Sequence, residues 1–207
     1  MTDSGMSSES ASAEPVTEVM DMSKKERGER DRMLTYKSFA VAFSYPDDQF
    51  LSFFKGSFSN KELDELKRAY DGLFRASEVW LYGTEHLAKN EFQRSNELAD
   101  IMGFYRAFGV EPDRDRPDSL PGELEFMHYL IFKRLHALKN GDTEDAREKA
   151  RICQDAERKF FRRHVHPAAT KIAEAILAKS ENGFYRETAQ ELLEFLESDE
   201  RFLGRDA

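Results

Sequence analysis

The sequence predicts an all-α protein that folds as a single-domain helical bundle. Apolar residues recur at spacings of three and four through most of the 207 residues, and this spacing is typical of helices with one buried face. No stretch shows the strict alternation of a half-buried strand. Glycine and proline fall where helices would end, and 40% of the residues are hydrophobic. A chain of this length and composition can bury a substantial core.

Two regions differ in composition. Residues 1–30 are rich in serine and acidic residues and offer little to bury, so we expect a disordered N-terminal tail there. Asp31 is a favourable helix cap, and residues 31–207 form the predicted all-helical domain. No repeat or long linker divides that domain.

The first half of the domain predicts three helices. One carries apolar residues from Met33 to Phe43 and is ended by Pro46. After a short aromatic segment, Asn60 can cap a second helix that extends through Phe74. A third contains Leu98, Ile101, Met102, Tyr105 and Phe108, and Gly109 follows it as the expected C-terminal glycine.

The second half begins with a stiff acidic segment, EPDRDRPDS at 111–119. Pro112 and Pro117 disfavour helix in the residues before them, so 110–118 is predicted to be an extended loop. Asp118 or Ser119 can cap the next helix, which tolerates Pro121 in its first turn and reaches about residue 140. Further helices are expected near 143–164, 167–179 and 186–196.

The helix after this loop is apolar on almost every side in its first half, which predicts that it is buried among neighbours. Two carboxylates, Glu123 and Glu125, nevertheless lie in that half. A buried charge must be paired, hydrogen-bonded or close to water, so these two residues stand out.

Charge and cysteine content restrict the class of protein. The net charge of −9 disfavours nucleic acid as a partner and favours a cationic peptide. A single cysteine, Cys153, suits a reducing compartment. No run of 18 apolar residues and no secretory signal occur. We therefore expect a cytoplasmic protein without a stable membrane insertion.

Signatures of catalysis are missing. The eleven glycines form no phosphate-binding loop, and Cys153 has the apolar helical setting of a packing residue. His164 and His166, like His128 and His136, lack neighbouring ligands at metal-binding spacing. Glu123 and Glu125 have no adjoining sugar or phosphate site. We predict no enzyme activity, no catalytic residue and no metal.

Several stretches resemble one family. The runs YRAFG (105–109), RPDSL (116–120) and ELEFM (123–127) are similar to the signature of the redox-enzyme maturation chaperones, the TorD/DmsD/NarJ family. YKSFAVAFSYP (36–46) resembles the first helix of that family, and ERKFFRRHVHPAATKIAEAI (157–176) resembles its late segment with His164 at the histidine position. The run ELEFM favours the nitrate-reductase and delta-subunit branch of this family, whose members serve selenate, chlorate, dimethyl-sulfide or ethylbenzene enzymes.

The resemblance implies a cytoplasmic, TorD-like chaperone that binds the catalytic subunit of a molybdoenzyme of the dimethyl-sulfoxide-reductase type. Such chaperones bind the apo-form or its twin-arginine leader, assist cofactor insertion and assembly, and hold back export. The resemblance implies no cofactor for this chain, because the molybdenum cofactor belongs to the client enzyme. It also allows a monomer or a helix-swapped dimer.

Two positions depart from the family pattern. Ser119 stands where members commonly have histidine, and Ala168 lies near the position where a tryptophan is often found. If either side chain contacts the client in relatives, that contact differs here.

Physical reasoning about the residues agrees with the resemblance. A leader with two guanidinium groups and an apolar stretch needs carboxylates at the edge of an apolar groove. The acidic loop residues Asp113, Asp115 and Asp118, together with Glu123 and Glu125, can supply the charge. Tyr105, Phe108, Leu124, Met127 and His128 can line the groove. The predicted client-binding residues are Tyr105, Gly109, Asp115, Arg116, Pro117, Asp118, Ser119, Leu120, Glu123, Glu125, Met127, His128 and His164.

Simpler interpretations remain open at this stage. Asp118 can be an ordinary helix cap, and Arg114 and Arg116 can neutralise the neighbouring acids. The apolar groove residues can belong to the core. The whole chain can instead be a helical subunit or adaptor retained in the mature redox complex. A nucleotide-responsive switch, a property associated with relatives, is a third alternative that no phosphate loop supports.

Overall fold

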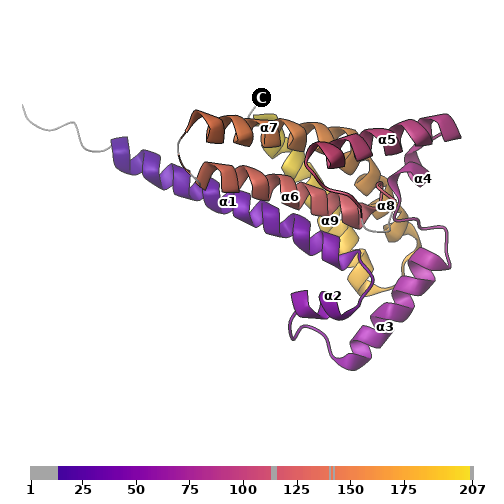
Figure 1. Ribbon diagram of the computed structural model, residues 1–207. Helices are drawn as coiled ribbons and strands as arrows, with labels where there is room; N and C mark the ends of the chain where they lie inside the picture. Colours follow the sequence, from indigo (N-terminus) through magenta and orange to yellow (C-terminus); the bar gives the residue numbers. More distant parts are fainter. Residues whose placement is uncertain (1–13, 113–115, 140, 142, 206–207) are drawn as a thin grey trace, which may run out of the picture.

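The computed structural model describes residues 14–112, 116–139, 141 and 143–205. Helices make up most of this part of the chain (Figure 1), and the only sheet-like contact within it is an isolated antiparallel bridge between Tyr82 and Ser119. The predicted all-α class is confirmed. None of the helices in the described ranges is long and apolar enough to cross a membrane.

Three long helices form one side of the molecule. The central one is α6 (Leu120–Lys139), which packs against α1 (Glu14–Ala42) and α7 (Glu144–Phe160). In Figure 1, α1 and α7 run along opposite flanks of α6. The helical hairpin of α8 (His166–Lys179) and α9 (Gly183–Arg205) completes the core, and a π-helical turn, η2 (Phe161–Val165), joins α7 to α8. The prediction that α6 is buried among neighbours is therefore confirmed.

The remaining elements lie towards the other end of the bundle. They are α2 (Asp48–Phe53), α3 (Asn60–Tyr70), the π-helical turn η1 (Asp71–Arg75), α4 (Gly83–Leu87) and α5 (Glu91–Ala107). Helix α3 is capped by Ser59, one residue before the expected Asn60, because Ser59 and Glu62 form a reciprocal capping box. Asn90 caps α5, and Gly109 follows it at φ 69°, the left-handed conformation expected there.

Helix α1 begins at Glu14, which differs from the expected disordered tail over residues 1–30. Glu29 is buried and pairs with Arg134 of α6. Arg32 is also buried, and it pairs with Glu157 of α7 and Asp199 of α9. These ion pairs anchor α1 at Glu29 and Arg32, within a stretch of the sequence that is almost entirely polar. Residues 1–13 of the expected tail lie outside the described residues.

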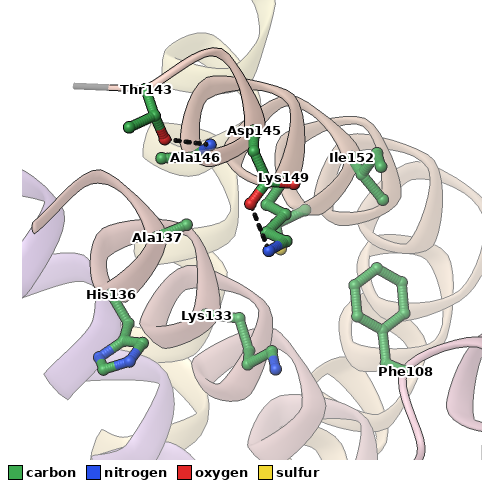
Figure 2. A pocket seen from close by; sticks show the side chains of 10 residues that line it. Phe108, Lys133, His136, Ala137, Thr143, Asp145, Ala146, Lys149 and Ile152 are labelled. Atoms are coloured by element: carbon green, nitrogen blue, oxygen red, sulfur yellow. Dashed lines mark hydrogen bonds and ion pairs between the residues drawn. The ribbon is translucent and has the colours of Figure 1, made fainter. Parts of the chain in front are cut away.

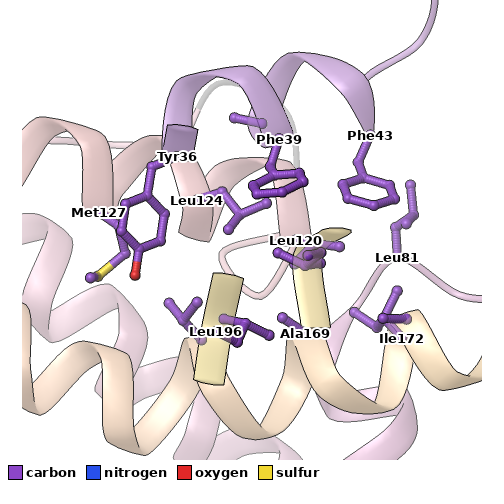
Figure 3. Close-up of a cluster of buried hydrophobic side chains, with 14 of the residues drawn as sticks. Tyr36, Phe39, Phe43, Leu81, Leu120, Leu124, Met127, Ala169, Ile172 and Leu196 are labelled. Carbon is purple, nitrogen blue, oxygen red and sulfur yellow. The ribbon is translucent and has the colours of Figure 1, made fainter. Parts of the chain in front are cut away.

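The core lies where α1, α6, α8 and α9 meet (Figure 3). Leu124 and Met127 of α6 are completely buried there, beside Tyr36 of α1 and Ile172 of α8. The simpler interpretation of Leu124 and Met127 as core residues is confirmed. Cys153 is likewise buried, and burial raises the pKa of its thiol, in keeping with a packing residue.

Candidate functional site

A groove of about 400 Å³ lies at the start of α6. One wall comes from the end of α5 and the residues that follow it, and the other comes from the first turns of α6. Four predicted site residues line it, namely Tyr105, Arg116, Ser119 and Glu125. The remaining lining residues are Val110, Glu111, Pro112, Gly122, Phe126 and Tyr129. The expected apolar groove with a charged edge therefore exists, although some of its residues differ from those predicted.

Asp118 is the anchor of this region. Its buried carboxylate accepts hydrogen bonds from the Thr84 amide (3.0 Å) and the Thr84 hydroxyl (2.6 Å). The Arg116 guanidinium donates to both carboxylate oxygens, at 3.0 and 2.8 Å. The Asp118 carbonyl also accepts from the Gly83 amide at 2.9 Å. Asp118 therefore fixes the loop to α4, which is a different role from the plain helix cap or the exposed acid considered from the sequence.

Arg116 is shared between several groups. Besides Asp118 it donates to Glu85 (2.5 Å) and to the Thr84 hydroxyl (2.7 Å), and its guanidinium lies 4.5 Å from the centre of the Tyr82 ring. Local neutralisation of the loop acids is thus confirmed for Arg116. Thr84, Glu85 and Tyr82 were not identified from the sequence, because no periodicity relates α4 to a loop more than thirty residues later.

Close packing of α4 on α8 accompanies this anchor. A Cβ added to Gly83 would meet the Cβ of Ala168 at 2.8 Å, so a small residue is needed on both sides of the contact. Ala168 is the position near which the family often has tryptophan.

Glu123 is completely buried, and its Oε2 atom has no hydrogen-bond partner. Burial, reinforced by the nearby charges of Asp118 and Glu97, raises the pKa of Glu123 well above its usual range. The neutral carboxylic acid is therefore favoured. The sequence singled out Glu123 correctly as unusual, but its carboxyl group is not at the surface of the groove.

Among the described residues that line the groove, the carboxylates that a ligand could reach are Glu111 and Glu125. Glu111 is exposed on the loop, and Glu125 is 47% exposed with Lys37 of α1 2.7 Å from both of its carboxylate oxygens. Asp113, Arg114 and Asp115 lie outside the described residues. Within the described part of the groove, the acidic edge thus consists of Glu125, which the sequence analysis named, and Glu111, which it did not.

Tyr105 forms the floor of the groove. Its hydroxyl donates to the Pro117 carbonyl at 2.9 Å, and its ring packs edge-on against Phe126 with centroids 4.8 Å apart. Burial, with Glu123 and Asp118 nearby, raises the pKa of this phenol. Ser119 is buried beside it, and a Cβ on Gly122 would come within 2.7 Å of the Ser119 hydroxyl. The groove floor therefore has little room for larger side chains.

The other predicted site residues lie away from the groove. Leu120 and Met127 belong to the core. A ring nitrogen of His128 lies 2.9 Å from the Met33 carbonyl on α1. His164 is buried 2.7 Å from Asp100 and 3.4 Å from Glu97, and burial lowers its pKa although Asp100 opposes this shift. Gly109 shapes the turn after α5. Within the described ranges, no three His, Cys, Asp or Glu residues are grouped to hold a metal.

Residues 39–174 match the family model described as nitrate reductase delta subunit. The chain belongs to this family. The matched span includes the groove, the Asp118 anchor and most of the core. The family resemblance expected from the sequence, including its lean towards the delta-subunit branch, is confirmed.

Two curated relatives are similar to this delta-subunit family member. The chlorate reductase assembly chaperone protein of Ideonella dechloratans is 31% identical over 140 residues, which cover 63% of this chain and 68% of the relative. The perchlorate reductase assembly chaperone protein of Dechloromonas aromatica (strain RCB) is 32% identical over 88 residues, or 41% of this chain and 36% of the relative. Both relatives are named as assembly chaperones.

The Asp118 anchor predicts a stability effect. Asp118→Asn removes the buried negative charge that pairs with Arg116 and replaces one of the two acceptor oxygens by a donor NH2 group, so the free energy of unfolding should fall by about 2–4 kcal/mol. Urea denaturation followed by circular dichroism measures this. Asp64→Asn, on the exposed face of α3, should change it by less than about 0.5 kcal/mol. Equal effects of the two substitutions would contradict the anchoring role.

Glu123 predicts a dependence of stability on pH. Its folded-state pKa lies above the unfolded value, so its contribution is present at low pH and is lost as pH rises through the folded pKa. Glu123→Gln should therefore stabilise the protein relative to wild type, by an amount that grows as the pH rises above 4.5, the ordinary pKa of glutamate. Urea denaturation across that range measures the difference. The exposed substitution Glu187→Gln should give a difference that stays flat, and a flat difference for Glu123→Gln would disprove the assignment.

Proposed function

We propose that this chain is a system-specific assembly chaperone for the catalytic subunit of a molybdenum-cofactor oxidoreductase of the dimethyl-sulfoxide-reductase family. The observation that carries the proposal is its membership of a family in which two similar proteins are named as chaperones for chlorate and perchlorate reductase assembly. In this proposal the chain binds its client in the cytoplasm before cofactor insertion and export. The molybdenum cofactor belongs to the client.

The groove at the start of α6 is the proposed binding site for the client's twin-arginine leader. Tyr105, Phe126 and Tyr129 give it an aromatic surface, and Glu111 and Glu125 give it an acidic edge. An apolar helical segment can pack on such a surface while its arginines reach the carboxylates. This combination of apolar and acidic groups favours a peptide that has both an apolar segment and arginines over a peptide that is only cationic.

Lys37 has a defined part in this proposal. It neutralises Glu125 in the free chain, at 2.7 Å from both carboxylate oxygens. A client guanidinium can replace it, because the planar fork of arginine bonds both oxygens of a carboxylate at once, whereas an ammonium acts as a point charge. Lys37 then moves into solvent, where it is already one-third exposed. The exchange makes the site selective for arginine.

The buried acids act indirectly in this proposal. Asp118 holds the loop that carries Arg116 and Pro117, and the Pro117 carbonyl in turn holds Tyr105. Glu123 lies beneath the groove without reaching it. Both residues therefore position the binding surface, while Glu111 and Glu125 contact the peptide.

One observation favours a second function. The family is described by the words delta subunit, which suits a helical subunit that stays in the mature enzyme. In that case the chain would be present in stoichiometric amount after cofactor loading, whereas a chaperone would leave.

Leader binding is tested by calorimetry with a synthetic peptide of the client's leader. Substituting Glu111→Gln together with Glu125→Gln should weaken binding about thirtyfold, since each removes a charge-assisted hydrogen bond worth roughly 1 kcal/mol at an accessible site. Replacing the two arginines of the peptide by lysines should weaken binding to the wild-type chain several-fold.

The matched control is Glu187→Gln with Glu191→Gln on the exposed face of α9, which removes the same charge away from the groove and should leave affinity within about twofold. Equal loss of affinity in the two double variants would show that net charge, rather than the groove, governs binding. Unchanged affinity in both would remove the groove from the mechanism.

A further inference from the structure

Two further grooves lie along the C-terminal half of α6, beyond the Tyr105 groove. One, of about 490 Å³, runs between α6 and α7, with Lys133, Lys149 and Ile152 on its walls (Figure 2). The other, of about 460 Å³, runs between α1 and α6. His136 lines both, so the two form one continuous surface over the C-terminal half of α6. We call this surface the α6 basic face, and its key residues are Arg30, Phe132, Lys133, His136, Leu138, Lys139, Lys149 and Ile152.

Large apolar side chains are exposed on the α6 basic face. Phe132 is 46% exposed, Leu138 is 51% exposed and Ile152 is 53% exposed. These three side chains come from two neighbouring helices and border the same pair of grooves. Exposed apolar groups gathered beside a groove and rimmed by polar residues are typical of a protein interaction site.

The charge of this face is opposite to that of the molecule. The whole chain has a net charge of −9, yet the described lining of the two grooves includes Arg30, Lys133, Lys139 and Lys149 against a single carboxylate, Asp145. Asp145 pairs with Lys149 at 2.5 Å, as Figure 2 shows. Among the side chains that the structure describes, no carboxylate lies within ion-pair distance of the other three cations.

We propose that the α6 basic face binds an acidic amphipathic helix of a partner protein. Such a helix can lie along α6 and place apolar side chains into both grooves, while its flanking carboxylates meet Arg30, Lys133 and Lys139. The two grooves flank the C-terminal half of α6, so a helix that lies along α6 can reach both of them. An anionic membrane is disfavoured, because the rest of the chain is strongly acidic and would be repelled from it.

This site is separate from the proposed leader groove. The two sites share no lining residue. They adjoin on α6, where the Lys133 ammonium lies 5.8 Å from the centre of the Tyr129 ring. The ligand chemistries are also opposite, since the leader is basic. The inference therefore does not depend on the proposed function, and either can fail without the other.

The test uses the full chain and a fluorescein-labelled, designed 18-residue helix with leucines on one face and glutamates beside them. Fluorescence anisotropy should show saturable binding that weakens at least about fivefold when NaCl is raised from 50 to 500 mM. Phe132→Ala should weaken binding at least about fivefold, as expected for an aromatic anchor. Lys133→Glu with Lys139→Glu should weaken it at least about tenfold.

Matched variants control for charge and for lost apolar surface. Lys55→Glu with Lys89→Glu makes the same charge change on exposed residues away from α6, and Phe92→Ala truncates a phenylalanine that is 76% exposed on α5. Both should bind the peptide within about twofold of wild type. Every substituted side chain is exposed, Phe132 to 46%, so circular dichroism should be unchanged and the free energy of unfolding should change little.

Several results would overturn the proposal. They are absence of binding by the acidic peptide, equal binding of a version with lysine in place of glutamate, and equal effects of the face and control variants. Binding to phosphatidylserine vesicles instead of the peptide, abolished by the Lys133→Glu and Lys139→Glu pair, would assign the face to a membrane. Self-association abolished by the same pair, measured by light scattering, would assign it to a second copy of the chain.

Discussion

The buried carboxylate of Asp118 is the interaction on which the start of α6 depends. It joins the amide and hydroxyl of Thr84 to the guanidinium of Arg116, and so ties together two segments that are far apart in sequence. Around it, the Leu120 amide donates to the Leu81 carbonyl at 2.8 Å. A buried carboxylate is tolerated because these donors replace water. The orientation of the loop, of Tyr105 and of the groove wall all follow from this anchor.

The acidic residues near this anchor divide into two kinds. Asp118 and Glu123 are buried, one fully hydrogen-bonded and the other held towards its neutral form. Glu111 and Glu125 are accessible at the groove. This division explains how a helix can be apolar nearly all round and still begin in a strongly acidic segment. The buried acids shape the surface, and the accessible ones determine which peptide charge it attracts.

Local rules predicted much of the fold from the sequence. Gly109 ends α5, Pro121 lies in the first turn of α6, and the apolar stripe of α6 is buried, because each depends on residues only a few positions apart. Contacts over long sequence separations were not predictable in this way. Glu29 and Arg32 lie in a charged run that resembles a solvated segment, yet their partners are Arg134, Glu157 and Asp199.

Contacts over long sequence separations also limited what the sequence could predict about the groove at the start of α6. The sequence identified Glu123 as unusual, but helical periodicity gives the direction of a side chain and not its distance from water. It also placed His128 on the groove and counted His164 among the client-binding residues, and these side chains contact α1 and α5 respectively. Thr84 and Glu85 carried no signal, since their importance arises only when α4 meets the loop before α6.

The most direct test of the proposed function compares the client's catalytic subunit before and after cofactor loading and measures how much of this chain is bound to it in each state. The catalytic subunit, purified through an affinity tag from cells with and without a supply of molybdenum cofactor, can be assayed for its molybdenum content and for the amount of this chain bound to it. The account predicts about one copy of the chain per cofactor-free subunit and essentially none on the loaded, active enzyme. A stoichiometric copy on the loaded enzyme would contradict a chaperone and identify a retained subunit.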